Sequence, residues 1–339
     1  FVDDPAFVSH GAARRALLHH CLAARSFRAL WTLEELGLPY RLHLLPFPPR
    51  MQRREYLALN PMGKVPAILH GDALVTEQVA QVDSKDMSFA VWARLAARVD
   101  HFLGQADVQG LVITHGTDTL EESAWFLQAL LNPGKPVVLT CAMRPATALV
   151  PDGPQNMLDA VAVASQSGAH GVLAVCAGVI HSARDVQKVH TYRLDAFSSG
   201  DAGPLGYVEE GRLRLLRNWP EAHTGKAPAA MENIASHDDG QNWPRVEIVM
   251  NYAGASAAVV QALVASGVRG LVVAGTGNGT LHHELEAALL QAQATGVRVV
   301  RATRCLEGRV LPKAGDAMPD SQGLSPVKAR VSLLLELMA

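Results

Sequence analysis

The stretch "VITHGTDTLEES", residues 112–123, joins an apolar run to a polar turn and then to an acidic segment typical of a helix start. In open α/β sheets, ligands bind at the carboxyl ends of the strands. A parallel strand followed closely by Thr117 and Asp118 would deliver a hydroxyl and a carboxylate to that edge. The stretch therefore predicts a strand, a functional turn and a helix.

Six apolar runs between residues 82 and 339 are typical of strands that are covered on both faces. They are "VQGLVIT" (108–114), "KPVVLTCA" (135–142), "HGVLAVCA" (170–177), "RVEIVMNYA" (245–253), "GLVVAGTG" (270–277) and "GVRVVRAT" (296–303). Two intervening segments are typical of helices. "TLEESAWFLQALL" (119–131) has Thr119 and Glu122 at capping-box spacing, and "SAAVVQALVASG" (256–267) ends in glycine. This alternation predicts an α/β fold with parallel sheets.

Two changes in residue composition and pattern divide the chain. Residues 219–243 are polar and contain Pro, Gly, Asn and Asp, which predicts a linker. Ahead of residue 78, "ARSFRALWTLEELGLPYRLHLLPF" (24–47) is typical of an amphipathic helix, a Gly-Leu-Pro stop and a strand. The expected organisation is a small α/β unit over 1–77, a domain over 78–220, a linker over 221–243 and a carboxyl-terminal domain over 244–339.

Composition excludes several classes of function. The chain has 339 residues, 49% hydrophobic and 18% charged, with a formal net charge of -2, so nucleic acids and anionic membrane surfaces are not expected partners. Its apolar runs are too short to span a bilayer and no signal-peptide pattern opens it, so a cytoplasmic location is expected. The four cysteines lack C-x-x-C spacing, so we expect packing rather than a metal site or disulfides. The chain opens on Phe1 rather than Met, which indicates a fragment or a processed product.

The turn after the first of these runs has two interpretations. A threonine hydroxyl is a poor nucleophile until a base removes its proton, and an adjacent aspartate can orient such a base, so Thr117 and Asp118 are candidate catalytic residues. Alternatively, Thr119 caps the helix, Asp118 completes the turn and Thr117 ends the strand, because these residue types are favoured at helix starts. The turn alone leaves both interpretations open.

Flanking motifs extend the pattern. "THGTDTLEE" (114–122), "CAMRPATALVPDGPQN" (141–156), "RDVQK" (184–188), "NYAGAS" (251–256), "GTGNG" (275–279) and "LSPVKARVSLLL" (324–335) follow one another. In order and approximate spacing they resemble the bacterial L-asparaginase family over residues 78–339. The resemblance implies a two-domain α/β fold without a cofactor. It also implies hydrolysis of L-asparagine, sometimes L-glutamine, to the acid and ammonia through a threonine acyl-enzyme.

The resemblance assigns a hydrogen-bonded triad to Thr117, Asp118 and Lys188. A lysine amine loses its charge when it is desolvated and can then accept a proton, while an aspartate holds it in place. Ser84, in "VDSKDM", would hold the substrate carboxylate, and Asp118 would also face the substrate amino group. Lys85 stands where the family commonly has a neutral or acidic residue, which puts its contact with substrate in doubt.

Asn278 in "GTGNG" matches an asparagine that a neighbouring subunit contributes to the site. The resemblance therefore implies a homo-oligomer, in the family usually a tetramer. Each carried-over residue also has a simpler interpretation: Lys188 as a solvated lysine, Ser84 as a loop serine and Asn278 as a turn former. The G-x-G-x-G pattern lacks the spacing of a nucleotide-binding loop. Arg144 and Asp152 are expected to shape a loop, and His115 to be structural.

One family segment is absent. Asparaginases begin with a strand and a T-G-G-T-I loop that carries the principal nucleophile, and these 339 residues contain no such stretch. Activity is therefore expected to be impaired. Since the first strand of a doubly wound sheet is central, residues 82–220 are expected to be poorly stable, while residues 244–339 should fold independently.

A second resemblance covers residues 17–77. "HHCLAARSFRALWTLEELGLPY" (19–40), "LNPMGKVPAIL" (59–69) and "LVTE" (74–77) are similar to the thioredoxin-like amino-terminal half of a glutathione S-transferase. It implies thiol activation by Ser26, a cis Val65-Pro66 bond whose valine backbone binds glutathione, and Glu77 as half of a Glu-Ser pair. Gln78 replaces the serine, and the helical second half of the transferase is missing.

Three functions thus stay open. The first is an asparaginase acting on a small-molecule amide, and the second is a glutathione-binding module fused to an inactive hydrolase. The third is a truncated or misjoined product without function, which the seam at "TEQVA" (76–80) favours.

Overall fold

The computed structural model describes two units, residues 1–81 and 82–339, each taken by itself below. In the first unit it describes the backbone of residues 16–21, 40–45, 67–70 and 73–74, together with residues 77–81. In the second it describes residues 82–220, 231–234 and 242–339.

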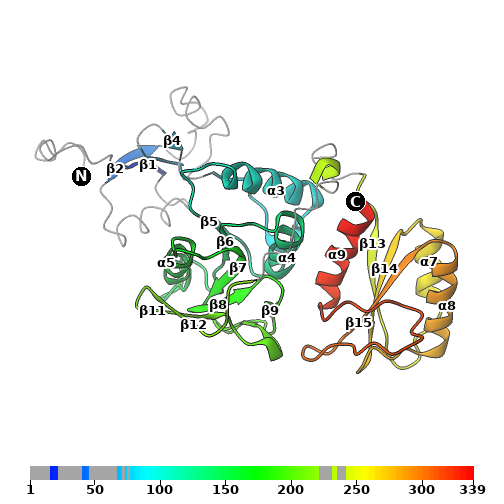
Figure 1. Ribbon diagram of the computed structural model, residues 1–339. Helices are drawn as coiled ribbons and strands as arrows, with labels where there is room; N and C mark the ends of the chain where they lie inside the picture. Colours follow the sequence, from blue (N-terminus) through cyan, green and yellow to red (C-terminus); the bar gives the residue numbers. More distant parts are fainter. Residues whose placement is uncertain are drawn as a thin grey trace, which may run out of the picture. The chain divides into compact units, whose positions relative to one another are not determined.

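The first unit contains a four-stranded sheet in the order β2-β1-β3-β4 (Figure 1). Strands β1 (Ala16–Cys21) and β2 (Tyr40–Leu45) pair in parallel. Strand β3 (Ala67–His70) runs antiparallel to β1, and β4 (Ala73–Leu74) runs antiparallel to β3. The predictions for Ser26, Val65 and Pro66 lie outside the described residues.

The second unit begins with a six-stranded sheet in the order β12-β11-β8-β7-β6-β5. Three predicted runs form its parallel part, which confirms them as strands: β5 (Leu111–Thr114), β6 (Pro136–Thr140) and β7 (Gly171–Cys176). Helix α5 (Gly153–Ala164) packs on all three strands, and α4 (Leu120–Leu131) packs on β7. Every residue of β6 and β7 is buried, as their continuous apolar runs require.

The other half of this sheet corrects the prediction of a parallel sheet. Strands β8 (Val179–Ser182), β11 (Gly206–Glu209) and β12 (Arg212–Leu215) all pair antiparallel, so the sheet is mixed. Two-residue turns make the hairpins: Ala177–Gly178 with φ of 52° and 75°, and Glu210–Gly211 with φ of 51° and 70°. Positive φ at both central residues is the requirement of a type I′ hairpin turn, whose twist matches that of the strands.

Helix α4 begins where it was predicted, but its capping box does not form. Thr119 is the N-cap residue and makes no side-chain cap hydrogen bond. Its Oγ1 instead donates to the carbonyl oxygen of Ser84 at 2.7 Å. The hydroxyl therefore ties the helix start to a segment 35 residues earlier.

The carboxyl-terminal sheet is parallel, as predicted, in the order β13-β14-β15. Its strands are β13 (Val246–Met250), β14 (Gly270–Gly275) and β15 (Arg298–Thr303). Helices α7 (Ala258–Ala265) and α8 (His283–Ala294) lie on one side, and α9 (Pro326–Met338) lies on the other (Figure 1). The predicted helix at 256–267 is thus confirmed, and Gly267 follows it with a φ of 82°.

The two sheets belong to one unit because helices pack across them. Helix α9 contacts both its own sheet and α4, where Trp125 Nε1 donates to Ser332 Oγ at 2.8 Å. A second link starts on α3 (Phe89–Leu103), where Phe89 stacks on Trp243 with ring centroids 4.8 Å apart. The independent folding of residues 244–339 stays a prediction, since α9 is shared.

Candidate active site

The turn between β5 and α4 is shaped by a close backbone approach. A Cβ on Gly116 would lie 2.4 Å from Ser84 Oγ, so only glycine fits here. His115 is fixed on both sides: its N–H donates to Thr140 O at 2.8 Å, and its Nδ1 donates to Gly116 O at 2.7 Å. Burial lowers the pKa of His115, which favours the neutral ring, and a structural role for this residue stays a prediction.

Ser84 lies directly against this turn. It opens a short 3-10 helix, Ser84–Asp86, and only 3% of the residue is exposed. Its Oγ accepts the N–H of Asp118 at 3.2 Å, while its carbonyl accepts the hydroxyl of Thr119. The structure therefore places Ser84 beside the predicted site, although 34 residues separate it from Asp118.

Lys188 reaches the same turn from a two-stranded ribbon outside the main sheet. The ribbon pairs β9 (Gln187–Lys188) with β10 (Phe197–Ser198). Lys188 Nζ donates to Thr117 Oγ1 at 2.9 Å and to Asp118 Oδ1 at 2.5 Å. The structure thus brings together the three side chains that the sequence singled out as a triad.

The triad is unequally exposed. The side chain of Lys188 is 17% exposed and that of Asp118 50%. Thr117 Oγ1 lies 3.5 Å from Asp118 Oδ1, at the outer limit of a hydrogen bond. Thr117 therefore interacts mainly with the amine, which is the arrangement that a hydroxyl nucleophile and its base require.

Glu121 was missed by the sequence analysis, which saw it only as part of an acidic helix start. Its Oε1 accepts the backbone N–H of Lys188 at 3.2 Å, and its Oε2 is buried with no partner. Burial raises the pKa of this carboxyl, and the positive charge of Lys328 opposes the shift. No local pattern could have revealed the contact, because 67 residues separate the two groups.

Lys85 does not join the triad through any described hydrogen bond. Its ammonium is ion-paired with Asp83 at 3.0 Å and with Asp86 at 3.3 Å, and its side chain is 61% exposed. These two neighbours raise the pKa of Lys85 by hydrogen bonding. The doubt about its contact with substrate stays.

Asn278 is used within the chain. Its Oδ1 accepts the N–H of Leu311 at 2.7 Å, and its Nδ2 donates to the carbonyl of the same residue at 3.3 Å. The amide thus joins the loop after β14 to residue 311. None of the hydrogen bonds described within the chain connects Asn278 to the triad, so its role in a neighbouring subunit's site stays a prediction.

Arg144 and Asp152 shape a loop, as expected. The carboxylate of Asp152 accepts the N–H groups of Met143 at 2.9 Å and Arg144 at 2.8 Å. The Arg144 guanidinium donates to Val150 O at 3.0 Å, which closes the loop on itself.

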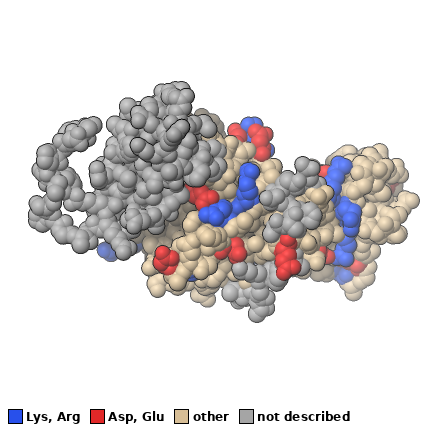
Figure 2. All heavy atoms as spheres, turned by 90° about the horizontal axis from the view of Figure 1, so that it is seen from above, with Lys and Arg blue, Asp and Glu red and all other residues tan. Residues whose placement is uncertain are grey.

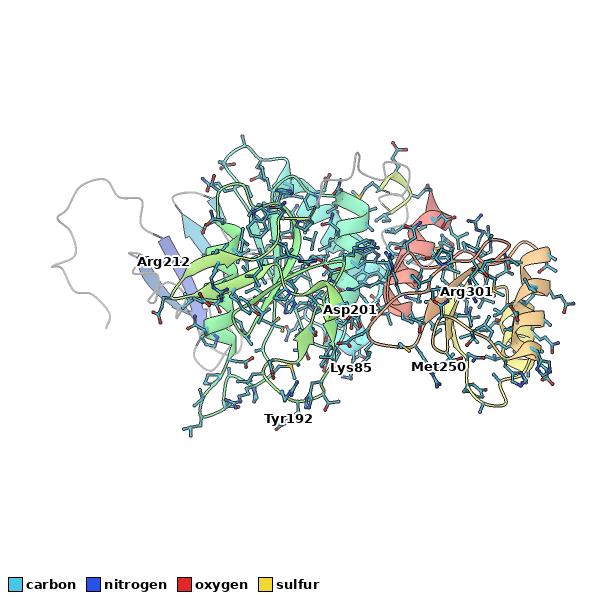
Figure 3. The ribbon with its side chains drawn as sticks, turned by 60° about the horizontal axis from the view of Figure 1, so that its bottom comes forward. Lys85, Tyr192, Asp201, Arg212, Met250 and Arg301 are labelled. Atoms are coloured by element: carbon cyan, nitrogen blue, oxygen red, sulfur yellow. The ribbon has the colours of Figure 1, made fainter. Side chains whose placement is uncertain are left out.

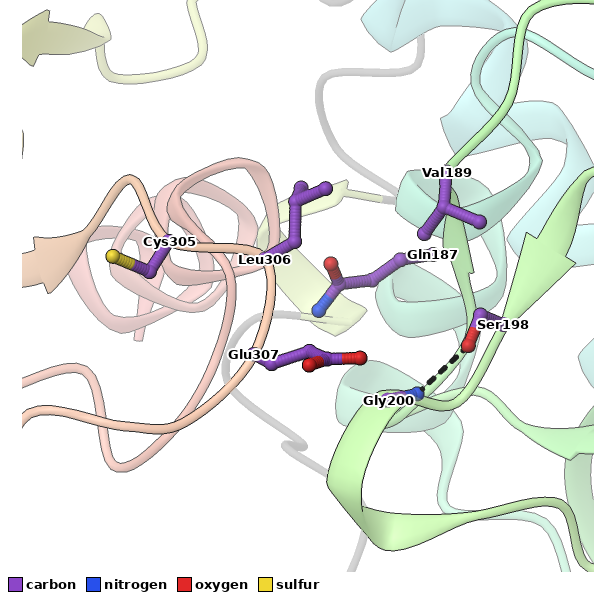
Figure 4. A pocket seen from close by; sticks show the side chains of 7 residues that line it. All are labelled: Gln187, Val189, Ser198, Gly200, Cys305, Leu306 and Glu307. Atoms are coloured by element: carbon purple, nitrogen blue, oxygen red, sulfur yellow. Dashed lines mark hydrogen bonds between the residues drawn. The ribbon is translucent and has the colours of Figure 1, made fainter.

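A hollow of about 430 Å³ lies beside the ribbon that carries Lys188 (Figure 4). It is lined by Gln187, Val189, Ser198, Gly200, Cys305, Leu306 and Glu307. Side chains alternate along a strand, so Gln187 and Val189 face the hollow while Lys188 points to the other side. The hollow is therefore distinct from the space around Thr117. The loop that joins β9 to β10 carries Tyr192, which is 87% exposed (Figure 3).

Other features of the described residues add no site. On the described part of the face in Figure 2, basic and acidic side chains are interspersed. Among the described residues, no group of three or more His, Cys, Asp and Glu side chains could hold a metal ion. No helix in the described ranges has both the length and the apolar character needed to cross a bilayer.

A threonine and an aspartate at a strand-to-helix turn of an α/β unit thus contact a lysine from the ribbon, and the lysine amine lies within hydrogen-bond reach of the threonine hydroxyl. The chain belongs to the asparaginase family: residues 47–221 match the model "Asparaginase, N-terminal" and residues 245–339 match the "Glutaminase/Asparaginase C-terminal domain". It is accordingly an L-asparaginase-like amidohydrolase.

Individual relatives agree with this assignment. L-asparaginase 2 of Escherichia coli (strain K12) is 38% identical over 285 residues, which cover 82% of this chain and 80% of that protein. L-asparaginase 2 of Bacillus subtilis (strain 168) is 37% identical, covering 77% of this chain and 69% of that one. The solved structure of a probable cytoplasmic L-asparaginase from Campylobacter jejuni is 38% identical, with a TM-score of 0.70 over 77% of this chain and 83% of that one.

The amino-terminal family match begins inside the stretch that resembles a transferase. It starts at residue 47, whereas the sequence predicted the asparaginase-like part from residue 78. Strands β3 and β4 therefore fall in a range covered by both the family match and the transferase resemblance.

Proposed function

We propose that this chain hydrolyses the side-chain amide of L-asparagine through Thr117, Asp118 and Lys188, at a rate far below that of relatives that carry a T-G-G-T segment. The observation that carries the proposal is the position of Lys188 Nζ, 2.9 Å from Thr117 Oγ1 and 2.5 Å from Asp118 Oδ1. A base within hydrogen-bond reach of a hydroxyl is what nucleophilic catalysis needs.

The contacts suggest a sequence of steps. The amine of Lys188 accepts the hydroxyl proton as Thr117 Oγ1 attacks the amide carbon, and Asp118 holds the amine in place. The tetrahedral intermediate collapses, the C–N bond breaks, and the proton held by Lys188 leaves with ammonia. A water molecule then hydrolyses the threonyl ester, with Lys188 again taking and returning the proton.

Ser84 and Asp118 would bind the amino-acid part of the substrate. The Ser84 hydroxyl accepts the Asp118 N–H and has its own proton left to donate to a carboxylate. The half-exposed Asp118 carboxylate can accept from the substrate ammonium. L-glutamine has the same α-substituents, so we include it as a second substrate.

The expected low rate follows from the lack of a T-G-G-T segment within these 339 residues. Removing a catalytic nucleophile commonly lowers kcat by several orders of magnitude, and the remaining rate reflects binding and electrostatics. Thr117 would have to supply the whole nucleophilic function. A second copy of the chain would contribute Asn278, which makes a homo-oligomer part of the proposal.

Ammonia release from L-asparagine by the purified chain tests the proposal. We expect slow release that Thr117→Ala abolishes, whereas the matched Thr147→Ala, on an exposed loop residue, leaves it unchanged. Release that survives Thr117→Ala would refute the assigned nucleophile. A turnover equal to that of a relative with a T-G-G-T segment would show instead that one threonine suffices.

The strand order of the first unit supports a second candidate function. The order β2-β1-β3-β4, with β1 and β2 parallel and the other pairs antiparallel, supports the resemblance of this unit to a thioredoxin-like half of a glutathione S-transferase. We propose weak glutathione binding there, through Val65, Pro66 and Glu77, with Ser26 near the thiol. Calorimetry should show weak binding that Glu77→Ala abolishes. Tight binding, or binding indifferent to that substitution, contradicts the proposal.

A further inference from the structure

Lys328 is the only lysine or arginine among the buried residues of the described chain. It is the third residue of α9, and none of its surface is exposed. No carboxylate lies within ion-pairing distance of it among the described salt bridges. A buried ammonium without a direct counterion is costly, and an apolar side chain could fill such a place without that cost. The lysine therefore calls for an explanation beyond packing.

The ammonium of Lys328 binds the chain that leads to Lys188. Its Nζ donates to the carbonyl of Arg184 at 2.8 Å and also to that of Val186. The second of these residues lies two positions before Lys188. Because β9 and β10 contribute only two residues each, their own pairing gives that segment little support.

Glu121 holds the same segment at its other end. Its Oε1 accepts the N–H of Lys188, and its second oxygen is buried without a partner. Glu121 is the second residue of α4, the helix that starts directly behind Thr117 and Asp118. Two side chains thus hydrogen-bond to the backbone of residues 184–188: Lys328 from α9 and Glu121 from α4.

The charges around Lys328 match this arrangement. Burial lowers the pKa of Lys328 to about 8, while the negative charges of Glu121 and Asp185 oppose the shift and Arg184 adds to it. His181, also buried, has its pKa lowered partly by the charge of Lys328. The negative charges of Glu121 and Asp185 therefore favour the charged form of Lys328, and the charge of Lys328 favours the ionised form of Glu121 against the effect of burial.

We propose that Lys328 is a positioning residue for the amide hydrolysis: with Glu121, it fixes residues 184–188 so that Lys188 Nζ stays within reach of Thr117 Oγ1. The inference rests on the proposed function and assigns part of that site to the carboxyl-terminal half of the chain. Misplacement of a catalytic group by about 1 Å costs on the order of a hundredfold in rate. A loosened segment would affect proton transfer more than substrate binding, because Ser84 and Asp118 lie on other segments.

The test compares two lysines with the same chemistry. Lys328→Met removes the amine but keeps the length of the side chain. Lys135→Met is the matched control, because Lys135 Nζ also donates to two backbone carbonyls, Leu103 O at 3.0 Å and Gln105 O at 2.6 Å, away from the triad. Each full-length variant is assayed for kcat and KM with L-asparagine. Hydrogen exchange of the Lys188 amide is followed alongside.

For Lys328→Met we expect kcat to fall at least about tenfold with KM within about twofold of wild type, and the Lys188 amide to exchange faster. Lys135→Met should change neither quantity. Equal losses in both variants, in proportion to the unfolded fraction, would overturn the proposal, as would an unchanged kcat and exchange rate in Lys328→Met.

Two further measurements keep the outcome decisive. If Lys328→Met does not fold, Glu121→Gln tests the contact that α4 makes with the same segment. It should lower kcat without changing KM, and an unchanged kcat would overturn the proposal. If the wild-type chain releases no ammonia, the proposed function fails by itself. Hydrogen exchange at Lys188 then still decides whether Lys328 holds the segment.

Discussion

Strands β5 and β14 have similar sequences and different surroundings. "LVIT" (111–114) and "GLVVAG" (270–275) are both apolar runs that lead into a polar loop with a predicted site residue. Strand β14 lies in the middle of its sheet, and all six of its residues are buried. Strand β5 ends its sheet, pairs with β6 alone among the described strands, and is half-buried with Thr114 exposed.

The comparison shows that an apolar run specifies a strand but not its place in the sheet. Both edge strands of the six-stranded sheet, β12 and β5, show the same. Strand β12, "RLRL", carries Arg212 and Arg214, and charges of this kind discourage further pairing at an edge. Strand β5 has no charge, as is typical of a strand that has a neighbour on each side. Its sequence suits a central position that the described residues do not give it.

The largest expected effect of this difference concerns side-chain truncation. Leu271, the second residue of β14, is fully buried, so Leu271→Ala should cost about 2 to 5 kcal/mol of unfolding free energy. Ile113 on β5 is only half-buried, so Ile113→Ala should cost about 1 to 2 kcal/mol. Urea unfolding of both variants measures the two values. Equal costs would mean that another part of the protein covers β5.

Most strands could be predicted from sequence, and the reason is local. Continuous apolar runs marked all six parallel strands of the second unit, and burial on both faces explains why β6, β7 and β14 carry no charged residue. The antiparallel strands were missed because the chain from 179 to 215 has short, partly polar strands. Both hairpin turns, Ala177–Gly178 and Glu210–Gly211, end in glycine, but Ala and Glu stand where Asn, Asp or Gly usually marks a type I′ turn, so the local signal was weak.

The site was predictable only in part. Thr117 and Asp118 follow from their position after a strand, whereas Lys188 and Ser84 came from the family resemblance. Glu121 and Lys328 were not singled out by either route. Their roles depend on contacts across 67 residues in one case and more than 140 in the other, and no local pattern records these contacts.

The next expected effect is a loss of stability in acid, which we attribute to His181 in the six-stranded sheet. Burial lowers the pKa of His181 on β8 from 6.5 to about 4. The unfolded chain therefore binds a proton between these pH values that the folded chain does not, so stability falls as the pH drops from 6.5 to 4. The difference in pKa corresponds to about 3 kcal/mol.

Unfolding in urea at pH 7 and pH 4.5 should reveal this loss. His181→Asn, which cannot titrate, should flatten the dependence, and His283→Asn on the exposed start of α8 should not. The same slope in all three proteins would place the acid sensitivity elsewhere.

Hydrogen exchange addresses the edge directly. A central strand has its N–H groups bonded on both sides, whereas an edge strand in a parallel pair has only alternate ones bonded. We expect the amides of residues 110–114 to exchange on average at least about a hundredfold faster than those of 270–275, a difference of roughly 2.7 kcal/mol. Equal and strong protection of both strands would show that the edge of β5 is covered, and that the expected weakness of residues 82–220 is wrong.

The smallest expected effect on stability concerns a substitution on β5, one of the two edge strands of the six-stranded sheet. Thr114 is exposed at the end of β5, so Thr114→Lys should change the unfolding free energy by less than about 0.5 kcal/mol. It would nevertheless place a charge on an uncharged edge and should slow aggregation at 37 °C several-fold, as followed by light scattering.

Arg212→Thr makes the reverse change at the β12 edge. Arg212 is exposed and β12 keeps a second charge in Arg214, so aggregation should quicken only slightly. If Thr114→Lys left the aggregation rate unchanged while Arg212→Thr raised it strongly, β12 would be the edge through which chains associate. The absence of charge on β5 would then indicate that another part of the folded protein covers its free edge. In that case β5 and β14 would differ in what lies beside them, and not in how exposed their edges are to solvent.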